Sequence, residues 1–237
     1  MRIRDRFSII LLDMNRTFMF GEDRFGPEQN FFATYLRLGG GNLSSQEVNA
    51  AVRSCFERML RDYRDPDRFD SFPSLEEGLK AYGGLPALPT GELCRLVDVF
   101  GSHEIGHIPD DFAAYLRELA RSHELALVSN IWAPKSCWLR EFERAGIGHV
   151  FKKTVFSSDF RSIKPSPVLF REALAASQAN TSKVLCVGDN LQRDIEPSKQ
   201  LGLATAWINP KVLRSSANEA CADYVIPSLL ALDEEAG

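Results

Sequence analysis

The sequence has no excess of basic residues, no long apolar run and no internal repeat. Its 28 lysines and arginines are outnumbered by 32 aspartates and glutamates, which gives a formal net charge of −4. Nucleic-acid-binding domains usually carry a basic patch, and a membrane-spanning helix needs about 20 consecutive apolar residues. These absences argue against nucleic acid and membrane as partners. The 237 residues suffice for one large domain or two small ones with a sizeable core.

Cysteine is scarce, and no two cysteines have the spacing of a metal site or a redox motif. The five are odd in number and widely separated: Cys55, Cys94, Cys137, Cys186 and Cys221. This usage differs from the disulfide framework of a small secreted domain. The pattern therefore predicts reduced thiols in a cytoplasmic protein.

The N-terminal segment imitates a secretory signal, because Arg2, Arg4 and Arg6 precede apolar residues. The apolar part, residues 7–12, is too short for one, and Asp13 ends it without a small-residue cleavage site. A short apolar run without a polar face instead predicts a strand buried on both faces of a parallel sheet. Ligands of open α/β sheets lie beyond the carboxyl ends of the strands, so Asp13 lies where chemistry takes place.

Residues 18 to about 105 carry helix signals and almost no strand signal. Two capping boxes, Ser44 with Glu47 and Ser74 with Glu77, each precede a helical pattern. Two further helices are expected in this region, at 27–38 and from 90 onward. The segment is predicted to form a small helical unit inserted into another fold.

From Pro109 onward, helix and strand patterns alternate. Strands are expected at 125–128, 150–157, 183–187, 203–208 and 223–226. Strands that alternate with helices indicate a parallel sheet with right-handed crossovers. We therefore expect an α/β fold, a Rossmann-like parallel sheet with helices on both faces, interrupted after its first strand by the helical unit.

Four polar residues end the predicted strands or lie in the loops after them: Asp13, Ser129, Lys164 and Asp189. They should meet at one edge of the sheet, and together they have a chemical logic. Asp13 can attack phosphorus as a carboxylate nucleophile, and with Asp189 it can share one Mg²⁺, a cation that prefers oxygen ligands. Lys164 would add a fixed positive charge, and the Ser129 hydroxyl would hold phosphate oxygens.

These residues belong to four short motifs: residues 13–17 (DMNRT), Ser129-Asn130, Lys164-Pro165, and Gly188-Asp189 with Asp194. In order and position they resemble the motifs of the haloacid dehalogenase superfamily, in its phosphatase-like branch with a helical cap inserted after the first strand. The resemblance implies an α/β core of residues 1–17 and 107–237 and an all-helical cap of residues 18–106.

The resemblance also implies roles for individual residues. Asp13 would be the nucleophile, and Mg²⁺ would be bound by Asp13, Asp189 and the backbone carbonyl of Asn15. Asp194 would contact the metal-binding residues without binding the metal itself. Ser129, Asn130 and Lys164 would contact the substrate. The implied substrate is a small phosphorylated metabolite, and we expect a monomer or a homodimer.

Asn15 departs from the family pattern, because the phosphatases carry a second aspartate at this position. That aspartate protonates the leaving group and then activates water, whereas an amide only donates and accepts hydrogen bonds. General acid–base help is worth roughly 10²–10⁴-fold in rate. Three explanations stay open: a substrate with a good leaving group such as an acyl phosphate, a proton donor elsewhere, or a catalytically weak phosphate-binding protein.

Two other classes compete with this interpretation. The 2-haloacid dehalogenases also lack the second aspartate, but they do not need the metal-binding pattern of Asp189 and Asp194. A receiver domain of signalling proteins also combines aspartate, serine or threonine, and lysine at strand ends. It would be about half this length and would lack both the helical insertion and the late Gly188-Asp189 motif.

Residues 103–107 (HEIGH) match the zinc-protease pattern H-E-x-x-H. That motif requires an uninterrupted helix that presents both histidines to the metal, together with a third ligand. Gly106 and Pro109 interrupt the helix, and no third ligand is evident. The segment is therefore interpreted as the linker from the helical unit back to the core.

Overall fold

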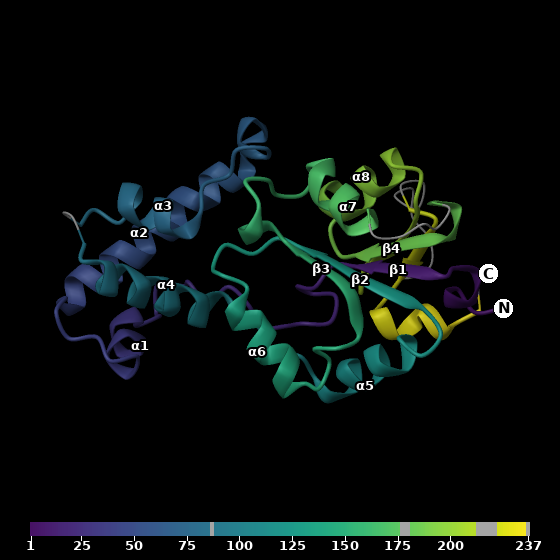
Figure 1. Ribbon diagram of the computed structural model, residues 1–237, viewed down its shortest axis with the longest axis horizontal. Helices are drawn as coiled ribbons and strands as arrows, with labels where there is room; N and C mark the ends of the chain where they lie inside the picture. The colour runs from purple at the N-terminus through teal and green to yellow at the C-terminus, as the bar shows by residue number, and fades with distance from the viewer. Residues whose placement is uncertain (86–87, 176–180, 212–221, 236–237) are drawn as a thin grey trace.

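A computed structural model describes residues 1–85, 88–175, 181–211 and 222–235 (Figure 1). At its centre lies a six-stranded parallel sheet in the order β3-β2-β1-β4-β5-β6. The strands are β1 (Ile9–Leu12), β2 (Glu124–Ser129), β3 (Phe151–Phe156), β4 (Val184–Gly188), β5 (Ala204–Ile208) and β6 (Tyr224–Ile226). The predicted α/β fold with a parallel sheet is confirmed, and the first strand of the chain lies between β2 and β4.

Strand β1 is buried on both faces, as its apolar sequence predicted. Ile9 and Leu11 belong to one apolar cluster, and Ile10 and Leu12 belong to the other. Successive side chains of a strand point to opposite faces, so each pair packs under a different layer of helices. The covering helices are α5 (Asp110–Leu119) and α6 (Ser136–Arg144) on one face and α7 (Pro167–Leu174) and α8 (Glu196–Gln200) on the other (Figure 1).

A helical insertion follows β1 and lies beyond one end of the sheet (Figure 1). Its helices are α1 (Phe31–Arg37), α2 (Ser45–Arg64), α3 (Leu75–Tyr82) and α4 (Thr90–Glu104). Both predicted capping boxes are formed: the Ser44 and Ser74 hydroxyls accept from the backbone N–H three residues on, and the Glu47 and Glu77 carboxylates accept from the serine N–H groups. These caps fix where α2 and α3 begin.

Helix α1 begins later than the sequence indicated, at Phe31 instead of Pro27. Two side chains set this start. The Asn30 side chain caps the helix by accepting from the Ala33 N–H, and the Phe31 N–H donates to Asn49 Oδ1 on α2. The second bond is a tertiary contact, which local sequence does not encode. The predicted stop is correct, because Gly39 adopts a left-handed φ of 81° directly after the helix.

Shorter helical turns complete the described chain. They are 3₁₀ turns at Arg4–Arg6, Pro66–Arg68, Ser157–Asp159, Thr181–Lys183 and Leu229–Asp233, and a π-helical turn at Leu191–Ile195. Within the described ranges, no helix is long and apolar enough to cross a membrane.

The chain leaves the sheet and returns to it through two adjacent segments. Phe20 and His107 exchange backbone hydrogen bonds of 2.9 and 2.8 Å. The Arg24 side chain ties the same segments together, since its guanidinium donates to the carbonyls of Ser102 and Ile105 at 2.7 Å each. The paired residues lie near the predicted boundaries at residues 17 and 107, but the division into core and cap stays a prediction.

The HEIGH segment lies at this junction. Helix α4 ends at Glu104, and Ile105 is extended, so His103 and His107 do not share a helix face. The imidazole of His103 bonds to Thr34 Oγ1 and to the Arg24 carbonyl. Glu104 accepts hydrogen bonds from the backbone N–H groups of Trp132 and Ala133 at 2.6 and 2.8 Å. The segment joins α4 to the loop after β2.

Candidate active site

Parallel strand pairing brings three of the predicted residues together. Leu12 at the end of β1 pairs with Leu127 of β2 and with Val187 of β4. Asp13 comes directly after β1, and its N–H donates to the Val187 carbonyl at 2.9 Å. Because Ser129 ends β2 and Asp189 follows β4, all of these residues lie at the carboxyl edge of adjacent strands.

Asp13 is buried, and both of its carboxylate oxygens have partners. Lys164 Nζ donates to Oδ1 at 2.6 Å, and Thr17 Oγ1 donates to Oδ2 at 3.3 Å. Burial and the nearby charges of Asp194 and Asp189 raise the pKa of Asp13 above its usual range, and Lys164 opposes that shift. A cation at this site would therefore help to keep Asp13 ionised.

Lys164 joins two carboxylates in the protein interior. Its Nζ lies 2.6 Å from Asp13 Oδ1, 2.6 Å from Asp194 Oδ1 and 3.0 Å from the Val128 carbonyl oxygen. Burial alone would lower the pKa of Lys164, but the two carboxylates raise it above its ordinary value. Lys164 is therefore a fixed cation with all three ammonium donors engaged.

Asn130 holds the Lys164 segment in place. Its Oδ1 accepts from the Lys164 N–H at 2.8 Å, and its Nδ2 donates to the Lys164 carbonyl and to the Tyr63 hydroxyl. Both amide protons are thus used within the protein. Its expected contact with substrate stays a prediction.

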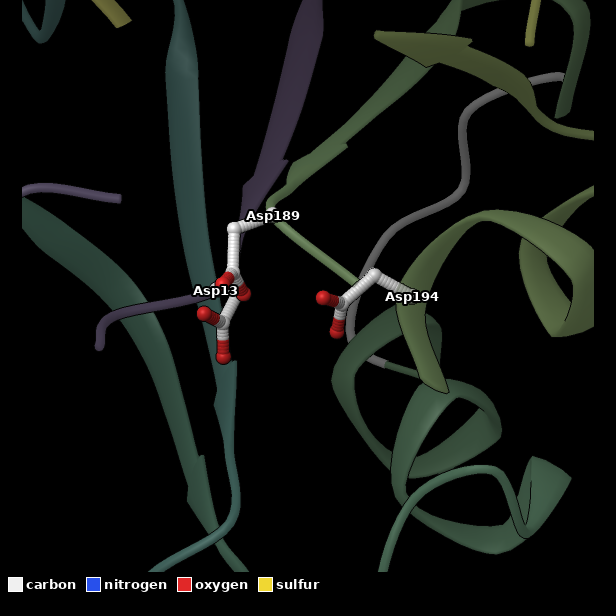
Figure 2. A group of neighbouring side chains, drawn as sticks. All are labelled: Asp13, Asp189 and Asp194. Carbon is white, nitrogen blue, oxygen red and sulfur yellow. The ribbon is translucent and has the colours of Figure 1, made fainter. Parts of the chain in front are cut away.

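Three carboxylates form a cluster suited to a metal ion. Oxygens of Asp13, Asp189 and Asp194 lie within 4.8 Å of one another, and Figure 2 shows the three side chains turned toward a common space. Burial and Asp194 raise the pKa of Asp189 to about 6, against the positive charges of Lys164 and Arg16. This all-oxygen, negatively charged set fits a hard divalent cation such as Mg²⁺.

Asp194 is the most enclosed of the three. Its Oδ1 accepts from Lys164, and its Oδ2 accepts from the Asn190 N–H at 3.1 Å. A Cβ on Gly188 would lie only 2.5 Å from this carboxylate, so the glycine leaves the space that Asp194 occupies. Its expected supporting role at the metal site stays a prediction.

Two predicted residues present buried polar atoms without partners. Within the described chain, neither Ser129 Oγ nor Asn15 Oδ1 has a hydrogen-bond partner, and both atoms are shielded from solvent. Buried polar atoms are nearly always satisfied, so these two are free to meet a ligand. Ser129 does not line the cavity described next, whereas Asn15 does.

A cavity of about 200 Å³ opens over the three aspartates. Its lining contains five carboxylates and three cationic side chains: Asp13, Glu22, Asp23, Asp189, Asp194, Arg16, Lys164 and Arg193. Asn15, Asn130 and Tyr63 also line it. The carboxylates outnumber the cations, so a phosphate dianion would be repelled unless a further cation were present.

Sequence reasoning missed four of these residues, Glu22, Asp23, Tyr63 and Arg193. In the sequence, Arg193 lies between Asp189 and Asp194. Its guanidinium carbon is 3.6 Å from the ring centroid of Tyr63 near the end of α2. It donates to the carbonyls of Tyr63 and Lys164. Only the position of Arg193 inside the fourth motif could have drawn attention to it.

The fold and the acidic centre at the ends of β1 and β4 are those of a hydrolase with a Rossmann-like parallel sheet and helices inserted after its central strand. The chain belongs to the haloacid dehalogenase-like hydrolases. The model of that family, "Haloacid dehalogenase-like hydrolase", matches residues 101–208. The glyceraldehyde 3-phosphate phosphatase of Pyrococcus abyssi is 30% identical over 174 residues, which cover 66% of this chain and 72% of that protein.

Other similar proteins match shorter segments or share the fold alone. The phosphoserine phosphatase of Thermus thermophilus is 33% identical over 85 residues, 36% of this chain and 34% of that protein. A 2-haloacid dehalogenase of Pseudomonas syringae superposes with a TM-score of 0.66 at 20% identity, covering 96% of this chain and 97% of that one. A magnesium-bound hydrolase of Bacillus subtilis gives 0.58 at 21% identity, over the same shares.

Proposed function

We propose that the protein is a Mg²⁺-dependent phosphatase that works through an aspartyl-phosphate on Asp13. The observation that carries the proposal is the contact of Lys164 Nζ with both Asp13 and Asp194, beside Asp189. A carboxylate nucleophile, a fixed cation and an oxygen-ligand cluster then share one cavity. The names of two relatives, both phosphatases, agree with this function.

The chain's own residues divide the work in this proposal. Thr17 and Lys164 orient the Asp13 carboxylate, so that one oxygen can attack phosphorus. Lys164 neutralises charge on the transferred group. The Ser129 hydroxyl is unpartnered but does not line the cavity, so it would donate to a phosphate oxygen only after a local shift of the loop that follows β2. Water then cleaves the aspartyl-phosphate and restores Asp13.

Mg²⁺ would be held by Asp13, Asp189 and the Asn15 carbonyl, with Asp194 as their support. When bound, it supplies positive charge that screens Asp13 from the phosphate dianion. The surplus of carboxylates in the cavity is the feature of this chain that calls for such a cation.

The proposed substrate is a small phosphorylated metabolite that enters between a core of residues 1–17 and 107–237 and a cap of residues 18–106. A cavity of about 200 Å³ suits a small molecule better than a large one. Asn15 favours substrates whose leaving group needs little protonation, such as an acyl phosphate, unless a proton donor elsewhere replaces the missing acid.

Asn15 also supports a second candidate, a phosphate-binding protein with little turnover. In that case the cavity would retain phosphorylated ligands and Mg²⁺ without releasing phosphate at a useful rate. A 2-haloacid dehalogenase is a weaker candidate, because the solved dehalogenase superposes at only 20% identity and so supports the fold alone.

A screen of phosphorylated metabolites with Mg²⁺ and with excess chelator separates these candidates. The proposed phosphatase releases phosphate only with Mg²⁺, and Asp13→Ala abolishes turnover while circular dichroism shows an unchanged fold. Asp98→Asn, on an exposed face of α4 outside the cavity, is the control and keeps full activity. Full activity in chelator or in Asp13→Ala would refute the mechanism. Ligand binding without turnover would favour the binding protein, and halide release from 2-haloacids would favour the dehalogenase.

A further inference from the structure

Asn15 leaves one chemical role of the proposed reaction without a residue. An alkoxide leaving group must gain a proton as its bond to phosphorus breaks, and the water that attacks Asp13-phosphate must lose one. Of the carboxylates in the cavity, Asp13 and Asp194 are bonded to Lys164. Glu22 Oε1 is bonded to Arg16, while its Oε2 is buried without a partner, and Asp189 belongs to the metal cluster. Among the described residues, Asp23 is the cavity carboxylate that makes no hydrogen bond and no ion pair and lies outside the metal cluster.

Asp23 lines the same cavity as Asp13 and Asn15. Its backbone is fixed at the junction of the insertion and the core. The Asp23 N–H donates to the Glu104 carbonyl at 3.1 Å, and the Asp23 carbonyl accepts from the Phe25 N–H at 2.9 Å. Its φ of 57° lies in the left-handed region, which aspartate adopts more readily than most residues.

The Asp23 carboxylate is free. Among the described residues it makes no hydrogen bond and no ion pair, although Arg16 and Arg24 lie in the same loop. The residue is exposed, so both water and a substrate can reach it. A free carboxylate at the edge of a reaction cavity is suited to exchange protons, since no partner holds it in one state.

We propose that Asp23 is the general acid and base of this site, in place of the acid missing at residue 15. The inference rests on the proposed phosphatase function. In the first step an Asp13 oxygen bonds to phosphorus, the bond from phosphorus to the leaving oxygen breaks, and the Asp23 carboxyl gives its proton to that oxygen. In the second step the water oxygen attacks phosphorus, the Asp23 carboxylate takes a proton from that water, and the bond from phosphorus to the Asp13 oxygen breaks. Phosphate leaves, and Asp13 and Asp23 regain their starting states.

The electrostatic surroundings of Asp23 agree with this role. Partial desolvation and the charge of Glu22 raise the pKa of Asp23 to about 6, against Arg16 and Arg24. Glu104 of α4 faces it from the other segment, and its own pKa is raised in part by Asp23. Across the cavity lie Asp13, Asp189, Asp194, Lys164 and Arg193. A carboxyl of this pKa is populated in both forms near neutral pH, as an acid that later acts as a base must be.

The test compares leaving groups in wild type and Asp23→Asn, both with Mg²⁺. Asparagine keeps the shape and tolerates the left-handed backbone, so the fold should survive. We expect kcat/KM for the best alkyl phosphate of the screen to fall by about 10²-fold or more. For 4-nitrophenyl phosphate, whose leaving group needs no proton, the burst of nitrophenol should stay within about tenfold while the later steady rate falls. The alkaline limb of the alkyl-phosphate pH profile should disappear.

Two further variants make the outcome decisive. Asp98→Asn serves as the matched control and should leave the turnover of both substrates unchanged. Glu22→Gln should keep the wild-type leaving-group ratio, which is the rate with the alkyl phosphate divided by the rate with 4-nitrophenyl phosphate. If the loss of alkyl-phosphate turnover appeared in Glu22→Gln and not in Asp23→Asn, Glu22 would have the role and the proposal would be overturned. Wild-type turnover with an unaltered leaving-group ratio in Asp23→Asn would overturn this inference alone. No turnover by wild type on any phosphate would overturn the proposed function as well, which distinguishes the two failures.

Discussion

At the residue scale, Lys164 is the most constrained side chain of the site. It is 3% exposed and lies 2.6 Å from each of two carboxylates whose side chains are 8% and 3% exposed. Desolvating three charges is costly, and only their close mutual contacts compensate for it. Removal of the cation alone would leave two carboxylates facing each other in the interior.

We therefore predict that Lys164→Met abolishes turnover and also destabilises the protein. The expected loss is about 3–5 kcal/mol of unfolding free energy, because an unpaired buried charge is strongly unfavourable. Urea unfolding measures it. Saturating Mg²⁺ should restore part of the loss if the cation lies against Asp13. A Lys164→Met protein as stable as wild type would show that Asp13 and Asp194 are not ionised together with Lys164 in the wild type.

The second residue-scale prediction concerns Asn15. Asn15→Asp adds a carboxyl without moving the backbone carbonyl proposed to bind Mg²⁺. Turnover of phosphates with poor alkoxide leaving groups should rise by up to about 10²-fold. Acyl phosphates should gain much less in the first step, since their leaving group is a stable carboxylate. Burst kinetics separate the two steps.

The effect of Asn15→Asp should be larger when Asp23 is disabled. In the Asp23→Asn background the new carboxyl at residue 15 would replace the missing general acid. In a chain that keeps Asp23 it would add a second one. A variant that binds Mg²⁺ normally but gains nothing on any phosphate, in either background, would show that proton transfer does not limit the rate.

Strand geometry decides which residues of the site could be predicted from the sequence. Asp13, Ser129 and Asp189 could be placed together because each ends or follows a buried strand, and parallel strands share an edge. Lys164 lies in a loop and not at a strand end, and Pro165 and Pro167 are the residues that indicate this loop. Tyr63 and Asp23 could not be found, because both reach the cavity only through the way the insertion folds back on the core.

At the element scale, the important link is between α4 and the loop after β2. Glu104 in the last turn of α4 accepts from the N–H groups of Trp132 and Ala133, so a carboxylate of the insertion satisfies two backbone donors beyond Ser129-Asn130. Burial and Asp23 raise the pKa of Glu104 to about 8, although the two N–H donors oppose the shift. In the unfolded chain the group has an ordinary pKa near 4.5.

This shift predicts a pH dependence of stability. Because the folded pKa lies above the unfolded one, the folded state binds the proton more tightly, and the contribution is complete below the unfolded pKa. It is lost as pH rises from about 4.5 through about 8. The difference in unfolding free energy between wild type and Glu104→Gln should therefore fall from pH 5 to pH 8. A constant difference would mean that Glu104 is ionised in the folded protein throughout that range.

Sequence patterns predicted elements well where the signal was local. The strands were predicted from apolar runs, and the starts of α2 and α3 were predicted from capping boxes. Each of these signals is encoded within a few residues. The start of α1 was predicted at Pro27 and lies at Phe31, because a hydrogen bond from Phe31 to Asn49 on another helix decides it. The link made by Glu104 was likewise hidden, since its partners lie 28 and 29 residues away in the chain.

At the scale of the whole molecule, the insertion and the sheet meet around the cavity. Trp132, two residues after Asn130, contacts aromatic rings from the insertion: Phe56, Tyr63, Phe72 and Phe100. Polar contacts also join the insertion to the core: Asp70 accepts from Ser166, and Glu77 pairs with Arg161. Among the described residues, Glu22, Asp23 and Tyr63 line the cavity from the insertion.

Arg193 connects this arrangement to the chemistry. In the sequence it lies between Asp189 and Asp194 of the aspartate cluster. Its guanidinium stacks on Tyr63 of α2 and donates to the carbonyl of Lys164. Any ligand that orders the loop after β4 would therefore also strengthen the contact with the insertion. A cap that opens for substrate and closes over it would exclude water during transfer.

Cap closure predicts that ligands protect the first joining segment from trypsin. Trypsin can cleave after Arg16 and Arg24 in the first segment, and Arg24 is bonded to carbonyls of the second. Mg²⁺ with beryllium fluoride, which mimics a phosphorylated aspartate, should slow cleavage there relative to the free protein. Arg193→Met removes the guanidinium but keeps an apolar side chain over Tyr63, so ligand protection should shrink in that variant. Cleavage after Arg16 and Arg24 at equal rates with and without the ligands would show that the insertion does not move over the site.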